Sequence, residues 1–128
     1  MFKTILFPVN QSQEARQAFD VVVEMVNKYQ AKLFVMSVVE AETSEIDRAA
    51  TADLLTEITD ALSKMGIPVE TKLGEGKPAF VICDIADEVA ADLIVMGSRG
   101  MSLAEEHPDG SVSQKVINLS PCPVLVVP

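Results

Sequence analysis

Two kinds of apolar pattern alternate along the chain. Short continuous runs of apolar residues are typical of strands buried on both faces, whereas apolar residues that recur every three or four positions predict amphipathic helices. The sequence predicts five strands from runs of the first kind, at Thr4–Val9, Leu33–Val39, Ile67–Leu73, Asp92–Met96 and Pro123–Val127.

The segments between these strands carry helix start and stop signals. Ser44, followed by Asp47 three residues later, is a capping pattern, and Gly66 stands where the same helix should end. Pro78 suits the first turn of the next helix. The sequence therefore predicts four helices: one capped by Ser12 with inward residues from Ala15 to Tyr29, one capped by Ser44 with inward residues from Leu54 to Met65, one opening at Pro78 with inward residues from Val81 to Val89, and one at Val112–Leu119.

Strands and helices follow one another in strict alternation. This order favours an α/β fold built on a doubly wound five-stranded parallel sheet with helices on both faces, because right-handed crossovers carry the helices to either side. No linker or repeat interrupts residues 1–128, so we expect a single domain. Open sheets of this kind bind ligands beyond the carboxyl ends of their strands, which directs attention to the residues after the first, second and fourth strands.

Composition and charge exclude several classes of protein. With 128 residues, 48% of them hydrophobic and 23% charged, the chain has the composition of a folded globular protein. Its net charge of −9 and its 10 scattered Lys and Arg residues offer no basic face to nucleic acid. No apolar stretch approaches the ~18 residues of a membrane span. Residues 40–60, with seven acids and one Arg, predict a solvated surface.

The two cysteines, Cys83 and Cys122, are far apart in the sequence and belong to no metal-binding pattern. Neither has a neighbouring cation that would activate its thiol, so we expect both to be packed, unreactive side chains. A reduced, cytoplasmic protein is the simplest interpretation of this cysteine content.

A glycine-rich motif follows the fourth predicted strand. Gly97 and Gly100 leave that strand, and the sequence Gly-Ser-Val-Ser begins at Gly110, a spacing of G-x2-G-x9-G-S. The first two glycines let the backbone turn and approach a ligand without a Cβ atom in the way. From Gly110 onward, backbone N–H groups and two hydroxyls meet at a helix N-terminus, which favours phosphate. On spacing alone a second interpretation stands beside this one: two glycines end a strand and a third begins a helix.

Five blocks of sequence, this motif among them, resemble the universal stress protein family in its single-domain form. The blocks are ILFPVNQS at the first strand, FVMSVVE at the second, DLIVMGSRG at the fourth, GSVSQKVI at the expected spacing beyond it, and the ending SPCPVLVVP. Together they span essentially the whole chain. The resemblance implies strand order 3-2-1-4-5 in an adenine nucleotide alpha hydrolase-like fold, a stress-response role and a homodimer formed through the C-terminal strand.

In nucleotide-binding members of that family the glycine loop holds ribose and phosphates. The resemblance therefore implies that this chain binds an adenine nucleotide, ATP above all, or AMP or ADP, with or without Mg²⁺. Val38 corresponds to the position that touches adenine and Asn10 to the family's first-strand aspartate. Occupancy would order the glycine loop and signal to an unknown protein partner. The implied site residues are Pro8, Val9, Asn10, Val38, Met96, Gly97, Arg99, Gly100, Gly110, Ser111, Val112 and Ser113.

Two departures from the family pattern bear on nucleotide affinity. Asn10 keeps hydrogen-bonding capacity but lacks the carboxylate that would assist a bound divalent ion. Two excess negative charges facing a triphosphate would cost about 1–2 kcal/mol, or about tenfold in affinity. The glycine loop has such an excess, because Arg99 is outnumbered by Glu105, Glu106 and Asp109.

The sequence assigns no catalytic and no metal-ligating residue. The single histidine, His107, has no orienting partner for a Ser-His-Asp set, and no side chain stands out as a general base. We therefore expect at most slow ATP hydrolysis, or autophosphorylation on Ser111 or Ser113. The alternative from a different class is a nucleotide-free dimeric interaction scaffold, which Asn10 and the acidic loop would favour.

Overall fold

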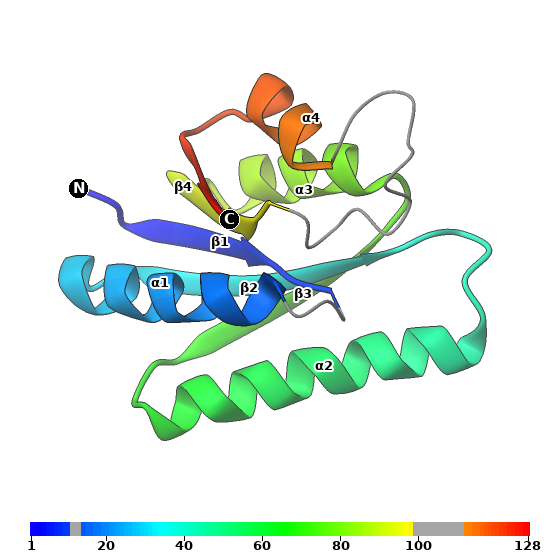
Figure 1. The fold of residues 1–128 in the computed structure, drawn as a ribbon, viewed down its shortest axis with the longest axis horizontal. Coiled ribbons are helices and arrows are strands. Elements are labelled where there is room, and N and C mark those ends of the chain that lie inside the picture. The colour runs from blue at the N-terminus through cyan, green and yellow to red at the C-terminus, as the bar shows by residue number, and fades with distance from the viewer. Residues whose placement is uncertain (11–13, 99–111) are drawn as a thin grey trace.

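The computed structural model describes residues 1–10, 14–98 and 112–128 of the chain (Figure 1). Within these ranges strands and helices alternate as predicted. Their bounds are β1 (Thr4–Pro8), α1 (Glu14–Tyr29), β2 (Lys32–Val39), α2 (Glu45–Lys64), β3 (Val69–Glu75), α3 (Pro78–Glu88), β4 (Leu93–Gly97), α4 (Val112–Leu119) and β5 (Val124–Val127).

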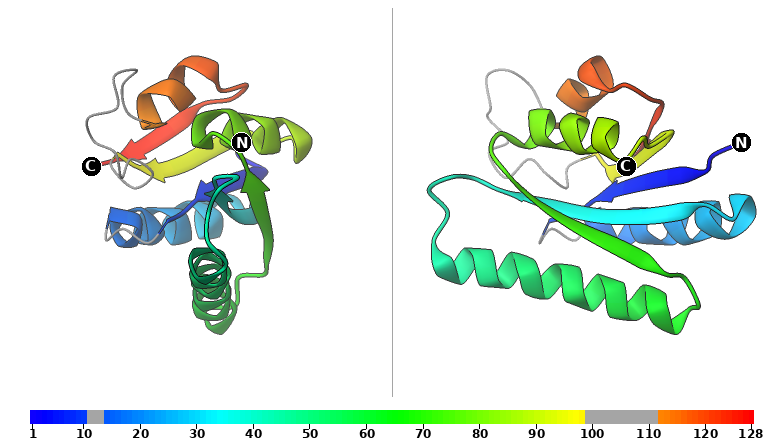
Figure 2. Two further views of the ribbon diagram at one scale, coloured as in Figure 1. Left: turned by 90° about the vertical axis from the view of Figure 1, so that its right-hand side faces the viewer. Right: turned by 180° about the vertical axis from the view of Figure 1, so that it is seen from behind.

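The strands form one parallel sheet in the order β3-β2-β1-β4-β5. The chain moves outward from β1 to β3 and then crosses back to β4 and β5. Right-handed crossovers therefore place α1 and α2 on one face and α3 and α4 on the other, and Figure 2 shows these two helix layers with the sheet between them. The predicted doubly wound fold and its strand order are confirmed.

The side chains of the central strands alternate between two apolar cores. Because these strands are covered on both faces, they appear in the sequence as continuous apolar runs, which is why they were located well. The core beneath α1 and α2 includes Ile5, Phe7, Val9, Leu33, Val35, Leu93 and Val95. The core beneath α3 and α4 includes Leu6, Phe34, Met36, Ile94, Met96, Ile82 and Val116.

The prediction was wrong by two residues at the start of the third strand. Ile67 belongs to the end of α2, where its N–H donates to the Leu62 carbonyl over 2.9 Å and the N–H of Gly66 donates to Ser63 over 3.0 Å. This is a Schellman motif, with Gly66 at φ 80°. Ile67 and Leu62 are both buried, while Met65, predicted to face inward, is 55% exposed because it occupies the helix cap.

The other helix signals have mixed outcomes. Ser44 caps α2 as predicted, since its Oγ accepts a hydrogen bond from the N–H of Asp47 over 3.1 Å. Pro78 is the first residue of α3. The cap predicted at Ser12 lies outside the described residues. The acids of residues 40–60 are all exposed, as expected for a solvated surface. None of the helices described here is both long and apolar enough to cross a membrane.

One carboxylate joins two strands at the amino end of the sheet. Asp92, just before β4, accepts hydrogen bonds from the N–H of Lys3 at 2.8 and 3.1 Å and from the N–H of Thr4 at 3.0 Å. Partial burial raises the pKa of Asp92, but these backbone donors outweigh it, so that the pKa lies below its usual value. The amino ends of β1 and β4 are therefore held together by an ionised side chain.

Candidate functional site

The carboxyl ends of β1, β2 and β4 lie at the end of the sheet opposite to Asp92. The register of the strands brings several of the predicted site residues close to one another there. β1 pairs in parallel with β2, and the N–H of Val9 continues the ladder by donating to the Met36 carbonyl over 2.8 Å. The same register brings Asn10 level with Val38. On the other side of β1, Ile5 and Leu6 pair with Leu93 and Ile94, so that β4 continues to Gly97 at the same end of the sheet. The switch point of the sheet, between β1 and β4, is thus flanked by predicted residues.

A buried hydroxyl fixes the end of β1. Ser37 is 2% exposed, and its Oγ donates to the carbonyl oxygen of Val9 over 2.7 Å. A buried carbonyl without a partner would be costly, so this hydrogen bond holds the chain in place immediately before Asn10. Ser37 was not among the predicted site residues, although a lone polar residue inside the run LFVMSVV is a signal of a buried hydrogen bond.

A second hydroxyl joins the end of β4 to the start of α4. Ser113 is 7% exposed, and its Oγ donates to the carbonyl oxygen of Ser98 over 3.1 Å. The N–H of Ser98 in turn donates to the carbonyl of Val127 on β5 over 2.8 Å. The chain therefore leaves β4 and enters α4 at one place, even though residues 99–111 separate the two points in the sequence. Ser98 was not predicted as a site residue.

The structure brings most of the described site candidates to the carboxyl end of the sheet. Pro8, Val9, Met96 and Gly97 are buried at the ends of β1 and β4, whereas Asn10, Val38 and Val112 are partly exposed there. Val38 packs on the α3 side of the sheet. Arg99, Gly100, Gly110 and Ser111 lie outside the described residues, as do the loop acids Glu105, Glu106 and Asp109 and the lone histidine His107.

The described part of the site is electrically neutral. Asn10, Val38, Ser98, Val112 and Ser113 carry no ionisable group. A neutral, partly buried surface beside a helix N-terminus suits an anion, because the helix dipole and backbone N–H groups favour negative charge there by about 0.3–1 kcal/mol per charge.

Arg48, a basic residue near the start of α2, is engaged in contacts within the fold. Arg48 forms an ion pair with Glu75 at the end of β3, and its guanidinium also donates to the carbonyls of Glu40, Ala41 and Thr43 over 3.3–3.4 Å. These contacts fasten the β2–α2 connection to the sheet. Arg48 therefore does not supply a charge for a phosphate in this arrangement.

Within residues 1–10, 14–98 and 112–128, no three His, Cys, Asp or Glu side chains gather as metal ligands. Asn10, which follows β1 at the switch point, carries an amide, and an amide oxygen is at most a weak single ligand for Mg²⁺. The described residues therefore form no Mg²⁺ site by themselves.

The two cysteines are packed side chains, as predicted. Cys83 is buried on α3 and Cys122 is partly buried against the same core. Burial raises the pKa of the Cys83 thiol, and nearby Asp84 adds to the effect. Burial also raises the pKa of the Cys122 thiol, outweighing the opposing hydrogen bond from Ser120. Neither thiol has the lowered pKa of a nucleophile.

Comparisons with known proteins cover the whole chain. The model of the universal stress protein family matches residues 1–128. Universal stress protein Sll1654 of Synechocystis is 48% identical over 136 residues, which cover 100% of this chain and 87% of that protein. Universal stress protein UspA from Lactobacillus plantarum has a similar structure, with a TM-score of 0.85 and 25% identity over 98% of this chain and 97% of that one. A universal stress protein crystallised in complex with cAMP gives a TM-score of 0.81 and 26% identity over 99% and 97% of the two chains.

Proposed function

The chain belongs to the universal stress protein family, and from this premise we propose that it binds an adenine nucleotide, ATP above all, at the carboxyl ends of β1 and β4. Binding orders the glycine loop and so changes how the protein presents itself to a partner in a stress response. A cytoplasmic location is part of the proposal and is supported by the two free cysteines.

The single observation that carries the proposal is the hydrogen bond from Ser113 to the carbonyl of Ser98, 3.1 Å long. It joins the end of β4, which lies beside the central strand β1, to the start of α4, so that the helix N-terminus lies near the switch point of the sheet. The strand end and the helix start, which flank the G-x2-G-x9-G-S segment in the sequence, thus lie together, as a phosphate site requires. The related structure in complex with cAMP supports an adenine nucleotide as the ligand.

Each residue has a proposed role. Val38 packs against the adenine ring and Asn10 hydrogen-bonds the sugar or the base. Mg²⁺ arrives with the phosphates. The backbone around the remaining proposed contacts receives ribose and phosphates: Pro8, Val9, Met96, Gly97, Arg99, Gly100, Gly110, Ser111, Val112 and Ser113.

Equilibrium titration with ATP and Mg²⁺ tests the proposal. We expect saturable binding with a Kd below about 1 mM. Gly110→Asp should abolish it, because a carboxylate and a Cβ atom would enter the proposed phosphate site. Ser63→Asp is the matched control, since it adds the same charge at an exposed position near the opposite end of the sheet. Equal affinities for Gly110→Asp and the unaltered protein would refute the proposal.

The nucleotide-free scaffold remains the second candidate, favoured by Asn10 and the acidic loop. Nucleotide released by heat from freshly purified protein would decide against it. Autophosphorylation is a third candidate, for which Ser113 is a poor acceptor because its hydroxyl is buried and donates to Ser98. Transfer of label from the γ-phosphate of ATP to Ser111 would support this third candidate.

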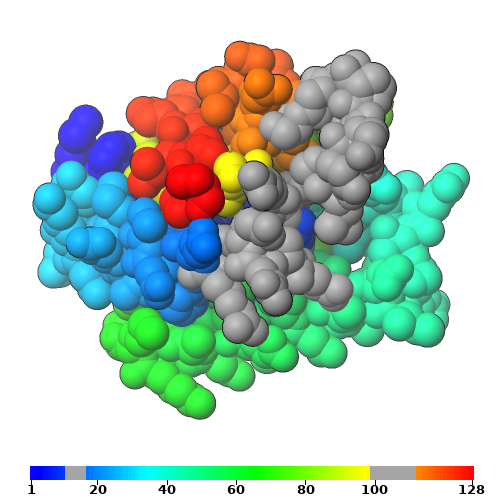
Figure 3. All heavy atoms as spheres, in the orientation of Figure 1, coloured from blue at the N-terminus to red at the C-terminus, as the bar shows by residue number. Residues whose placement is uncertain are grey.

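We also propose a homodimer formed through β5, the outer strand next to β4. Figure 3 shows this last strand at the surface, between α1 and α4. Pairing across a two-fold axis would cover its free edge and Leu125, which is 36% exposed. Sedimentation should give about twice the monomer mass of 13.8 kDa. Leu125→Lys should yield monomers, while Met65→Lys, a control at the exposed apolar residue that caps the end of α2, should not.

A further inference from the structure

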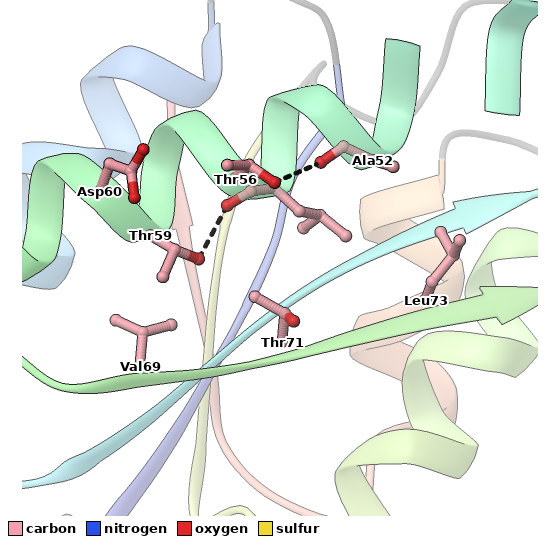
Figure 4. Close-up of a pocket in the computed structure, with 8 residues that line it drawn as sticks. Ala52, Thr56, Thr59, Asp60, Val69, Thr71 and Leu73 are labelled. Atoms are coloured by element: carbon pink, nitrogen blue, oxygen red, sulfur yellow. Dashed lines mark hydrogen bonds between the residues drawn. The ribbon is translucent and has the colours of Figure 1, made fainter. Parts of the chain in front are cut away.

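A groove of about 370 Å³ runs between α2 and β3, at the edge of the sheet away from β5. Figure 4 shows Val69, Thr71 and Leu73 reaching from β3 toward the helix. Leu73 is 49% exposed although it is a large apolar side chain. The groove takes no part in the proposed nucleotide site, whose residues lie on β1, β2, β4 and α4.

The groove has a mixed lining, in which apolar side chains alternate with threonines and Asp60. Thr56 and Thr59 turn their hydroxyls back to the carbonyls of Ala52 and Leu55, over 3.1 and 2.7 Å, as the dashed lines in Figure 4 mark. With their hydroxyls bonded in this way, the two threonines contribute methyl groups to the lining. Asp60 is the one charged residue among the described residues that line the groove.

Among the described residues, no strand pairs with the outer side of β3, which borders the groove. The N–H of Gly76 donates to the Val39 carbonyl on β2 over 2.9 Å. Because alternate residues of a strand direct their backbone groups to the same side, Gly74 and Lys72 also face β2, in agreement with the parallel register. Val69, Thr71 and Leu73 then direct their N–H and C=O groups outward, on the same residues whose side chains line the groove.

The rim acids of the groove are three carboxylates of α2, of which Asp60 lines the groove itself, and Lys64 follows them on the same side of the helix. Asp53, Glu57 and Asp60 are exposed on α2 at positions i, i+4 and i+7, so they lie along one side of the helix. Among the described residues, none of the three takes part in a salt bridge. Arg48, on the same helix, is paired with Glu75. The net charge of −9 adds a long-range attraction for positively charged partners.

We propose that this groove is a docking site for an extended, basic segment of a partner protein. The segment adds to β3 as a sixth strand, places its small apolar side chains in the groove and pairs its Lys or Arg side chains with the rim acids. A second copy of this chain fits less well, because pairing of two β3 edges would bring two acidic rims together.

Synthetic peptides test the docking site without knowledge of the natural partner. One peptide has the length of β3, 7 residues, and carries both Lys and Val on the face that would meet α2, with Thr at the intervening positions, because successive side chains of a strand point to opposite faces. Its counterpart carries Glu in place of Lys. Nuclear magnetic resonance of the isotopically labelled full chain should show saturable shifts at Val69, Thr71 and Leu73 with the Lys peptide only. Added salt should weaken this binding. Equal binding of the two peptides, or shifts confined to other strands, would overturn the proposal.

Charge reversal supplies the matched comparison. The triple variant Asp53→Lys/Glu57→Lys/Asp60→Lys should weaken binding of the Lys peptide about tenfold, because three exposed ion pairs are lost. The control Asp20→Lys/Glu24→Lys/Asp87→Lys makes the same change in net charge at exposed positions on α1 and α3 and should stay within about twofold of the unaltered chain. Equal losses in the two triple variants would show that net charge alone attracts the peptide, and the docking site would be rejected.

Thr71→Pro tests strand addition separately. Its N–H faces away from β2, so proline removes a hydrogen-bond donor for the incoming strand while the pairing with β2 remains. We expect the variant to fold and to lose peptide binding. If it fails to fold, the two charge-reversal variants still decide the question. Self-association of the unaltered chain that Thr71→Pro abolishes would assign this edge to a second copy and overturn the proposal.

Discussion

Side chains form hydrogen bonds with backbone groups at both ends of the sheet, but the side chain at the amino end is a carboxylate and those at the carboxyl end are neutral hydroxyls. At the amino end, the carboxylate of Asp92 accepts hydrogen bonds from the N–H groups of Lys3 and Thr4. At the carboxyl end, neutral hydroxyls donate to strand carbonyls, from Ser37 to Val9 and from Ser113 to Ser98. Negative charge is thus used where strands begin and is absent from the described residues where β1 and β4 end.

This difference follows from strand direction. Strands begin with N–H groups that need acceptors and end with carbonyls that need donors, so a carboxylate fits one end and a hydroxyl the other. A hydroxyl donates a hydrogen bond to a carbonyl without adding a charge, so it adds no repulsion against an anion at the carboxyl end. The proposed phosphate site therefore depends on how the carbonyls were satisfied as well as on the glycines.

The largest effect we expect comes from Asp92→Ala. Removing the carboxylate leaves the N–H groups of Lys3 and Thr4 without their acceptor and should lower the free energy of unfolding by about 1–2 kcal/mol, allowing for its partial exposure. Affinity for ATP should not change, because the amino end takes no part in the site. Urea denaturation and ATP titration measure the two quantities, with Asp87→Ala, an exposed acid on α3, as the control. A loss of ATP affinity would show that the two ends are coupled.

The contribution of Asp92 should also depend on pH. Its pKa in the folded protein is lowered by the backbone donors, so the stabilisation is present above the unfolded pKa of about 4 and is lost as the pH falls through the folded pKa. The difference in unfolding free energy between the unaltered protein and Asp92→Asn should be constant from pH 7 to pH 5 and shrink below about pH 4. Urea denaturation across that range provides the check, and a difference at pH 3 that is as large as the difference at pH 7 would contradict the prediction.

The sequence predicted the parts of the molecule that depend on local pattern. The strands covered on both faces were predicted because most of their residues are buried, which requires a continuous apolar run. The cap at Ser44 was predicted because it depends on one hydroxyl and one N–H only three residues apart. The two-residue error at Ile67 arose because an apolar residue that closes a helix looks the same in sequence as one that opens a strand.

The site was predictable only in outline. Glycine spacing and strand ends located it, but the hydrogen bonds from Ser37 and Ser113 join residues 28 and 15 positions apart, respectively, and no local pattern specifies such partners. The interactions of Arg48 with Glu75 and with the β2–α2 connection were missed for the same reason, since they depend on how the strands come together.

The two hydroxyls of the carboxyl end should separate stability from binding. Ser37→Ala and Ser113→Ala each remove one donor from a strand carbonyl and should each cost about 1 kcal/mol of unfolding free energy. Ser113→Ala should in addition weaken ATP binding about threefold, because α4 loses its connection to Ser98, whereas Ser37→Ala should affect affinity less. Urea denaturation and ATP titration of both variants test this contrast. Equal affinities for the two variants would show that the link from α4 to β4 does not position the site.

The smallest effect we expect comes from putting a carboxylate where the carboxyl end has none. Asn10→Asp places one negative charge beside the proposed triphosphate, and at ~8 Å in water this costs about 0.5 kcal/mol, or about twofold in affinity. With Mg²⁺ present the same carboxylate adds a ligand and should reverse the sign of the change. Calorimetric titration with ATP in EDTA and then in Mg²⁺ measures both, with Asn118→Asp on the exposed face of α4 as the control. If Asn10→Asp changes affinity equally in the two buffers, Asn10 does not adjoin the phosphates, and the neutrality of this end has another cause.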